Sequence, residues 1–143
     1  MIIANIYLNF DGKCKEAFDF YKLVFGGEFA YSGTFGEMPS APGMPELSEE
    51  FKQRIMHISL PLGGSSILMG SDILPQMGHQ LNEGNNFAVS LLLETMEEAD
   101  KVFGMLADGG SITMPLEKTF WGAYYGQVTD AFGIHWMVNV ELK

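Results

Sequence analysis

The feature that most constrains the fold of this chain is an internal repeat with a period of 82 residues. A repeat of a whole supersecondary unit sets the architecture before any motif is considered. The alternative is a chance similarity between two amphipathic helices, whose loose patterns match easily. The matched positions are Glu16-Ala17 with Glu98-Ala99, Tyr21 with Phe103, Leu23 with Met105, and Gly27 with Gly109.

Each repeat is predicted to hold one strand, one helix and three further strands. Apolar residues recur at helical spacing after Lys13 and again from Met96 to Asp108, with β-branched and aromatic runs on either side. We expect Asp11 to cap the first helix and Gly26-Gly27 to end it. Tight turns are expected at Gly63-Gly64 and at residues 130–133. The predicted strands are residues 3–9, 28–35, 53–62, 65–71, 86–94, 111–116, 123–129 and 134–140.

This order predicts an α+β fold built from two tandem βαβββ modules within a single domain, residues 1–143. The modules are residues 1–72 and 85–143, and a loop at 73–84 joins them. A sheet covered on one side only leaves its other face bare, so we expect a curved mixed sheet around a shared cavity. Residues 37–50 hold three prolines and four acidic residues, which predicts a loop that is mobile or folds over a site.

Composition excludes several partners. The net charge of −10 disfavours contact with a phosphate backbone, so no nucleic-acid partner is expected. No apolar run approaches the length of a membrane span, and no signal peptide is recognisable at the first residues. Cys14 is the only cysteine, which favours a reducing cytoplasm. It has no neighbouring histidine in the sequence, so we interpret it as an inert structural thiol.

The segment from Phe120 to Trp136 gathers six aromatic residues around three glycines. Aromatic rings carry large apolar area with a defined geometry, and a rim of them can line a pocket for a small organic molecule. We therefore take Trp121, Tyr124 and Tyr125 as candidate pocket residues. The alternative is that these rings fill the core of a sheet.

Two histidines fall within predicted strands. Side chains alternate between faces along a strand, so Ile55, His57 and Ser59 are expected to share one face. His135 and Met137 share a face of the last strand by the same rule. A histidine in a cavity can act as a general base near neutral pH, which makes His57 the candidate catalytic residue. The alternative is a histidine that is hydrogen-bonded in a core or an interface.

Three stretches carry a family resemblance: residues 7–28 (YLNFDGKCKEAFDFYKLVFGGE), 55–60 (IMHISL) and 114–136 (MPLEKTFWGAYYGQVTDAFGIHW). Together with the repeated βαβββ order, they resemble the vicinal-oxygen-chelate superfamily, which includes glyoxalase I, bleomycin-resistance proteins and extradiol dioxygenases. Within it, the chain is similar to the PhnB-like group, often labelled 3-demethylubiquinone methyltransferase-like. The methyltransferase label has no support here, because the chain lacks the glycine-rich strand-to-helix motif of a Rossmann-type methyl-donor site.

In the enzymes of this superfamily, His and Glu side chains on four strands hold a divalent metal. The resemblance places these positions near Asn5 or Tyr7, near Leu68 or Met69, near Ala88 or Ser90, and at or near Met137. None of these residues is His, Asp or Glu, whereas such a site needs about three ligands with nitrogen or oxygen donors. No metal and no other cofactor is therefore expected.

We interpret the chain as a PhnB-like protein that binds a small apolar or aromatic metabolite, with any catalysis independent of a metal. One alternative is a non-catalytic protein of the bleomycin-resistance type that sequesters a compound, and another is a metalloenzyme whose ligands are not placed by the resemblance. The resemblance also implies a homodimer. With His57 as the base, the expected ligand-binding residues are Tyr7, Ser59, Ser90, Trp121, Tyr125, Gln127 and Met137.

Overall fold

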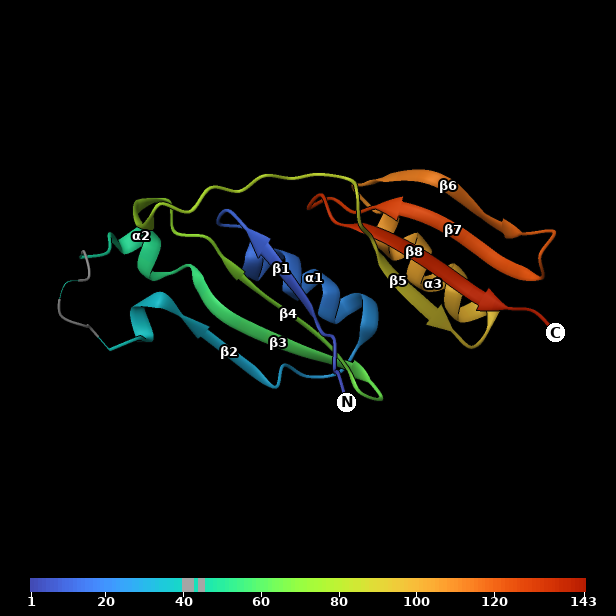
Figure 1. The fold of residues 1–143 in the computed structure, drawn as a ribbon, viewed down its shortest axis with the longest axis horizontal. Helices are drawn as coiled ribbons and strands as arrows, with labels where there is room; N and C mark the ends of the chain where they lie inside the picture. Colours follow the sequence, from blue (N-terminus) through green and yellow to red (C-terminus); the bar gives the residue numbers. More distant parts are fainter. Residues whose placement is uncertain (40–42, 44–45) are drawn as a thin grey trace. The chain divides into compact units, whose positions relative to one another are not determined.

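The structure, a computed structural model, describes residues 1–39, 43 and 46–143. The described chain divides into two compact units, Met1–Asn82 and Glu83–Lys143. Each unit contains one four-stranded mixed sheet and one long helix (Figure 1). Among the described residues, no helix has both the length and the apolar character required to span a membrane.

The sheet of the first unit has the strand order β1-β4-β3-β2. β1 runs parallel to β4, whereas the β2–β3 and β3–β4 pairs are antiparallel. The turn between β3 and β4 is the expected one, since Gly63 and Gly64 have φ values of 109° and 56°. The strands are β1 (Ile6–Phe10), β2 (Tyr31–Thr34), β3 (Ile55–Gly63) and β4 (Ser66–Asp72).

Helix α1 (Cys14–Phe25) covers one face of this sheet. Its buried side chains recur every three or four residues, as an amphipathic helix requires. The ring of Phe18 packs edge-on against Phe10 and lies over Gly70, where an added Cβ would come within 2.7 Å of Phe18 Cε1. The helix ends at Phe25 before Gly26, whose φ of 77° is readily adopted by glycine, as predicted.

The prediction that Asp11 caps α1 is wrong. The residue at the cap position is Lys13, with no side-chain cap, and the carboxylate of Asp11 pairs instead with Arg54 at 2.7 Å. Asp72, at the end of β4, supplies the acceptor: its Oδ1 receives the N–H groups of Gly12 (2.8 Å) and Cys14 (3.0 Å). A carboxylate distant in sequence therefore satisfies N–H groups at the start of the helix, which have no intrahelical partner.

The described residues of the first unit also form three short helices: η1 (Phe35–Glu37), α2 (Glu49–Lys52) and η2 (Pro75–Met77). The loop predicted at 37–50 lies partly outside the described residues. Its last two residues belong to α2, which is capped by Ser48 Oγ accepting the N–H of Phe51 at 3.2 Å. The loop predicted after β4 contains the η2 turn, and the next strand starts at Val89.

The second unit repeats this arrangement, with the strand order β5-β8-β7-β6. β5 is parallel to β8, and the other two pairs are antiparallel. The strands are β5 (Val89–Leu93), β6 (Ser111–Lys118), β7 (Ala123–Thr129) and β8 (His135–Glu141). Asp130 stabilises the turn before β8, because its Oδ1 accepts the N–H groups of Phe132 and Ile134 and its Oδ2 accepts Trp136 Nε1 at 2.8 Å.

Helix α3 (Met96–Ala107) covers one face of the second sheet, beginning and ending 82 residues after α1. Thr95 caps it by accepting the N–H of Glu98 at 3.1 Å. Phe103 of α3 lies against the backbone at Gly126, where an added Cβ would come within 2.9 Å of the ring. The predicted repeat of strand, helix and three strands is therefore confirmed, and so is the α+β fold class.

Candidate functional site

Each sheet has one face packed against its helix and one face turned away from it, which we call the open face. Alternation along β1, β3 and β4 places Leu8, Leu60 and Leu68 against α1, with exposed fractions of at most 4%. The open face of the first sheet carries three of the predicted site residues, Tyr7, His57 and Ser59. Tyr7 and Ser59 share the cross-strand partner Met69 on the central strand β4.

His57 lies between two tyrosine rings. Its Nδ1 is 3.2 Å from the hydroxyl oxygen of Tyr7, and the two rings stack with their centroids 5.6 Å apart. The ring of Tyr31 lies 5.8 Å from the imidazole on the other edge of the sheet. Tyr31 was not predicted as a site residue, and the signal that could have found it is its place on the strand paired with the one that carries His57.

Ile55 does not lie on the face that it was expected to share with His57 and Ser59. The β2–β3 register shifts between Gly33 and Thr34, so that Gly33 faces His57 while the next residue faces Ile55. This extra residue on β3 is a β-bulge, and it reverses the alternation at that point. Ile55 is accordingly only 1% exposed, and His57 and Ser59 keep the open face without it.

On the second sheet, Ser90, Met137 and Gln127 form a row across three strands. Ser90 is the register partner of Met137, which in turn pairs with Gln127. Gln127 Nε2 donates a hydrogen bond of 2.8 Å to the hydroxyl of Tyr125, two residues along the same strand. The predicted residues Ser90, Tyr125, Gln127 and Met137 therefore share one open face.

Trp121 precedes β7 and contacts this face. Its ring centroid is 6.1 Å from that of Tyr125, in an edge-on arrangement, and the residue is 59% exposed. Tyr124 does not join them, because its hydroxyl donates to Asp100 Oδ1 on α3. That hydrogen bond raises the pKa of Tyr124 above its usual value of 10. Of the three rings proposed from the sequence, Trp121 and Tyr125 lie together and Tyr124 faces the helix.

His135 has both ring nitrogens occupied. Its Nδ1 is 2.7 Å from Thr129 Oγ1, and its Nε2 is 2.8 Å from the carbonyl oxygen of Gly84. A carbonyl accepts only, so Nε2 carries the hydrogen and Nδ1 accepts the threonine hydroxyl. With no free nitrogen, His135 stabilises the start of the second unit and is not available as a base.

The positions that hold a metal in the superfamily now have a definite register. Tyr7 pairs with Met69 in the first unit, and Ser90 pairs with Met137 in the second. A phenol, a hydroxyl and two thioethers do not fit a divalent ion that is held by imidazole and carboxylate groups. Within the described residues, no three His, Cys, Asp or Glu side chains group to hold a metal ion. These residues therefore support no reaction step that uses a metal ion.

Cys14 is fully buried at the start of α1. Burial, and then the nearby carboxylate of Asp72, raise the pKa of its thiol well above the ordinary value. A thiol held in the protonated form is a poor nucleophile. The structural interpretation of this cysteine therefore agrees with its surroundings.

The eight predicted site residues thus lie in two groups, three on the open face of the first sheet and five on or beside the open face of the second. A chain of two βαβββ modules, each with one sheet face left open by its helix, belongs to the structural class of tandem-module α+β proteins. The model of the Glyoxalase/Bleomycin resistance protein/Dioxygenase superfamily matches residues 5–138, and the chain belongs to this family.

Three relatives support this assignment. Protein YjdN of Escherichia coli is 37% identical over 139 residues, which cover 94% of this chain and 92% of YjdN. The crystal structure of protein PA1353 from Pseudomonas aeruginosa is also 37% identical, with a TM-score of 0.85 and full coverage of both chains. The PhnB protein from Bacillus cereus is 26% identical, with a TM-score of 0.75, and 97% of this chain and 99% of that one are covered.

Proposed function

We propose that this chain binds a small, largely apolar or aromatic metabolite on the open faces of its sheets, with any catalysis independent of a metal. The observation that carries the proposal is the exposure of aromatic rings on these faces: Tyr7 is 44%, Tyr31 49% and Trp121 59% exposed. Apolar surface that gathers beside a few polar groups is typical of ligand sites.

The second unit offers a pairing of ring and polar group suited to an aromatic ligand. Trp121 and Tyr125 present ring surface, and the Gln127 amide lies beside them, fixed by its hydrogen bond to Tyr125. Aromatic pairs contribute about 0.5–1.5 kcal/mol beyond the area that they bury. The amide carbonyl of Gln127 remains as an acceptor that orients the ligand.

In the first unit, His57 is the candidate base. If its Nδ1–H donates to the oxygen of Tyr7, Nε2 is free to accept a proton from a bound molecule. In the other tautomer, Tyr7 donates and Nε2 carries the hydrogen. Catalysis through His57 therefore requires the first tautomer, in which the hydroxyl oxygen of Tyr7 accepts the hydrogen bond.

The binding proposal is tested with indole as the probe and calorimetry as the measurement. Tyr125→Ala is expected to weaken indole binding about tenfold, which corresponds to about 1.4 kcal/mol. Tyr124→Ala is the matched control, because Tyr124 is the adjacent residue of the same strand and faces α3. Equal affinities in the two variants would contradict the proposal.

A second candidate function is sequestration without turnover. The stacking of His57 on Tyr7, with 27° between the ring planes, favours it, because a stacked imidazole contributes contact area whether or not it moves a proton. For any compound that the protein converts, His57→Ala should abolish turnover and leave affinity unchanged if His57 is the base. Tight binding without conversion in both proteins would favour sequestration.

We also propose that the chain acts as a homodimer in a reducing cytoplasm. The homodimer is what the family resemblance implies, and the lone buried Cys14 favours a compartment where disulfides do not form. Light scattering on the purified protein measures the first point directly, and a monomer at micromolar concentration would contradict it.

A further inference from the structure

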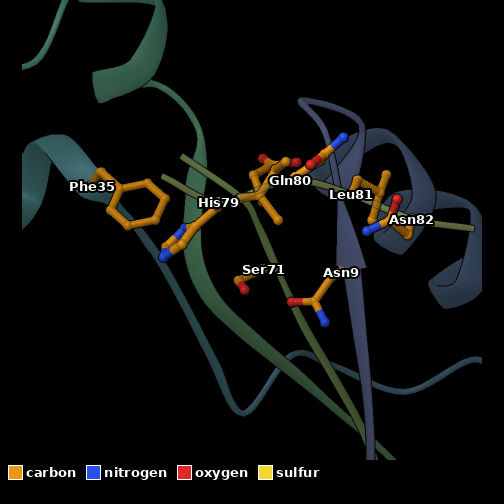
Figure 2. Close-up of a pocket in the computed structure, with 9 residues that line it drawn as sticks. Asn9, Phe35, Ser71, His79, Gln80, Leu81 and Asn82 are labelled. Carbon is orange, nitrogen blue, oxygen red and sulfur yellow. The ribbon is translucent and has the colours of Figure 1, made fainter. Parts of the chain in front are cut away.

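A pocket of about 560 Å³ lies in the first unit, where the chain after β4 passes over the open face of the sheet. Figure 2 shows its labelled lining, with Asn9 and Ser71 on neighbouring strands and residues 79–82 arriving from the following loop. Its volume falls within the range of about 300–1,000 Å³ that is typical of small-molecule sites. The lining residues are Asn9, Phe35, Ser71, Asp72, Ile73, His79, Gln80, Leu81 and Asn82.

Residues 79–82 are held in place by the turn that precedes them. Leu74 is 3% exposed, and its backbone N–H donates to His79 Nδ1 at 3.2 Å. Gly78 takes the left-handed conformation, with φ of 84°, that lets the chain reverse after η2. Because Nδ1 accepts a hydrogen bond, the neutral ring of His79 carries its hydrogen on Nε2, which is then a donor.

The polar side chains of the lining are almost all uncharged. Asn9 and Ser71 are direct register partners on the open face, and within the described part of the chain neither side chain has a hydrogen-bond partner. Asp72, the one charged residue in the described part of the lining, is 4% exposed, and its carboxylate receives the N–H groups of Gly12, Cys14 and Ile55. Among the lining residues that the structure describes there is no lysine or arginine.

This chemistry selects for a neutral ligand. An anion would find no cationic side chain and would be repelled by a protein of net charge −10. A cation would find only a carboxylate that is already hydrogen-bonded, and it would lose hydration without compensation. Phe35, Ile73 and Leu81 add apolar wall to the neutral donors and acceptors.

We propose that this pocket is a binding site for a small neutral molecule that joins a planar ring to an amide or hydroxyl group. The ring packs against Phe35, and the polar group bonds Asn9, Ser71 and His79 Nε2. His79 also acts as a positioning residue, since its bond to Leu74 fixes the segment that closes the pocket. The site lies on an open sheet face and so rests on the proposed function, but it uses none of the site residues named above.

Three probes of matched shape and different charge test the proposal: benzamide is neutral, benzoate is an anion and benzylamine is a cation at pH 7. Binding is followed by titrating each into ¹⁵N-labelled protein and recording amide NMR spectra. Benzamide is expected to move the backbone signals of residues 79–82 and the side-chain amide signals of Asn9 and Asn82, with saturation. Both charged probes are expected to bind at least tenfold more weakly.

Variants then separate the pocket from non-specific contact. Asn9→Ala and Ser71→Ala should each weaken benzamide binding about tenfold. Asn86→Ala is the matched control, an exposed amide removed from the loop before β5 in the second unit, and it should change the affinity less than twofold. Two pocket variants are used so that the proposal can still be tested if one of them does not fold.

The proposal is overturned if the three probes bind equally, if benzamide moves no signal in residues 79–82, or if the two pocket variants bind as the wild type does. Failure of the aromatic-ligand proposal has a different signature, because indole would then leave the signals of Trp121 and Tyr125 unchanged. The two outcomes are therefore read from different signals of the same labelled protein.

Discussion

The hydroxyl of Tyr7 lies 3.2 Å from His57 Nδ1, although 50 residues separate them in sequence. Their strands are not neighbours: β4 runs between β1 and β3, so the contact spans the central strand of the sheet. Tyr7 thus contacts the candidate base through both its hydroxyl and its ring, and helps to orient the imidazole.

Removing that hydroxyl tests the relationship. Tyr7→Phe is expected to shift the ¹⁵N signal of His57 Nδ1, because the nitrogen loses its hydrogen-bond partner. The free energy of unfolding should fall by less than about 1 kcal/mol, since the contact is exposed. Tyr31→Phe is the control: its ring lies near His57, but its hydroxyl lies over Gly33. Equal shifts in both variants would contradict the assignment.

The carboxylate of Asp72 joins three segments of the first unit by accepting backbone N–H groups from Gly12, Cys14 and Ile55. Asp72→Ala would leave these donors unpaired, and each unsatisfied buried group costs about 1–3 kcal/mol. We expect the free energy of unfolding to fall by about 3 kcal/mol or more, measured by urea denaturation.

Asp19→Ala is the matched control for that measurement. Asp19 pairs with Lys15 on the surface of α1, where both side chains are more than half exposed. Surface pairs of this kind contribute about 0.5 kcal/mol or less. A similar loss of stability in the two variants would show that Asp72 does not join the three segments as described.

Helix α1 illustrates what the sequence can and cannot predict. Its length and buried face follow from the spacing of apolar residues, and its end follows from Gly26, because these signals are local. Its N-terminal partner, Asp72, lies 58 residues from Cys14, and no local pattern points to it. The bulge in β3 opposite Gly33 was not predictable for a similar reason, because the register between strands is set by tertiary packing.

For the candidate site, strand alternation was sufficient to place His135 with Met137 on one face of the last strand and His57 with Ser59 on one face of β3. Strand alternation gave the wrong face for Ile55, because the β-bulge inserts an extra residue between Ile55 and His57. The pocket at residues 79–82 could not be predicted, because a loop without periodicity gives no signal of what it passes over.

The buried thiol of Cys14 predicts a pH dependence. Because the folded-state pKa is raised, the thiol ionises first in the unfolded chain, near pH 8.5, and stability falls as the pH rises above that value. In Cys14→Ala this loss is absent. The stability advantage of the wild type over Cys14→Ala should therefore shrink by about 2 kcal/mol between pH 7 and pH 10.

Urea denaturation of both proteins at the two pH values measures this change. The stability lost through poorer packing in Cys14→Ala is the same at both pH values, so it cancels from the comparison. A constant difference between wild type and variant would mean that the thiol titrates alike in the folded and unfolded states.

The central claim, that the open sheet faces bind a small aromatic molecule, is tested most directly by the two tryptophan side-chain signals of ¹⁵N-labelled protein during titration with indole. Trp121 is 59% exposed beside Tyr125, whereas Trp136 is fully buried and donates to Asp130. The account predicts that the Nε1 signal of Trp121 moves with saturation while that of Trp136 stays in place. A Trp121 signal that does not move, or that moves without saturation, would contradict it.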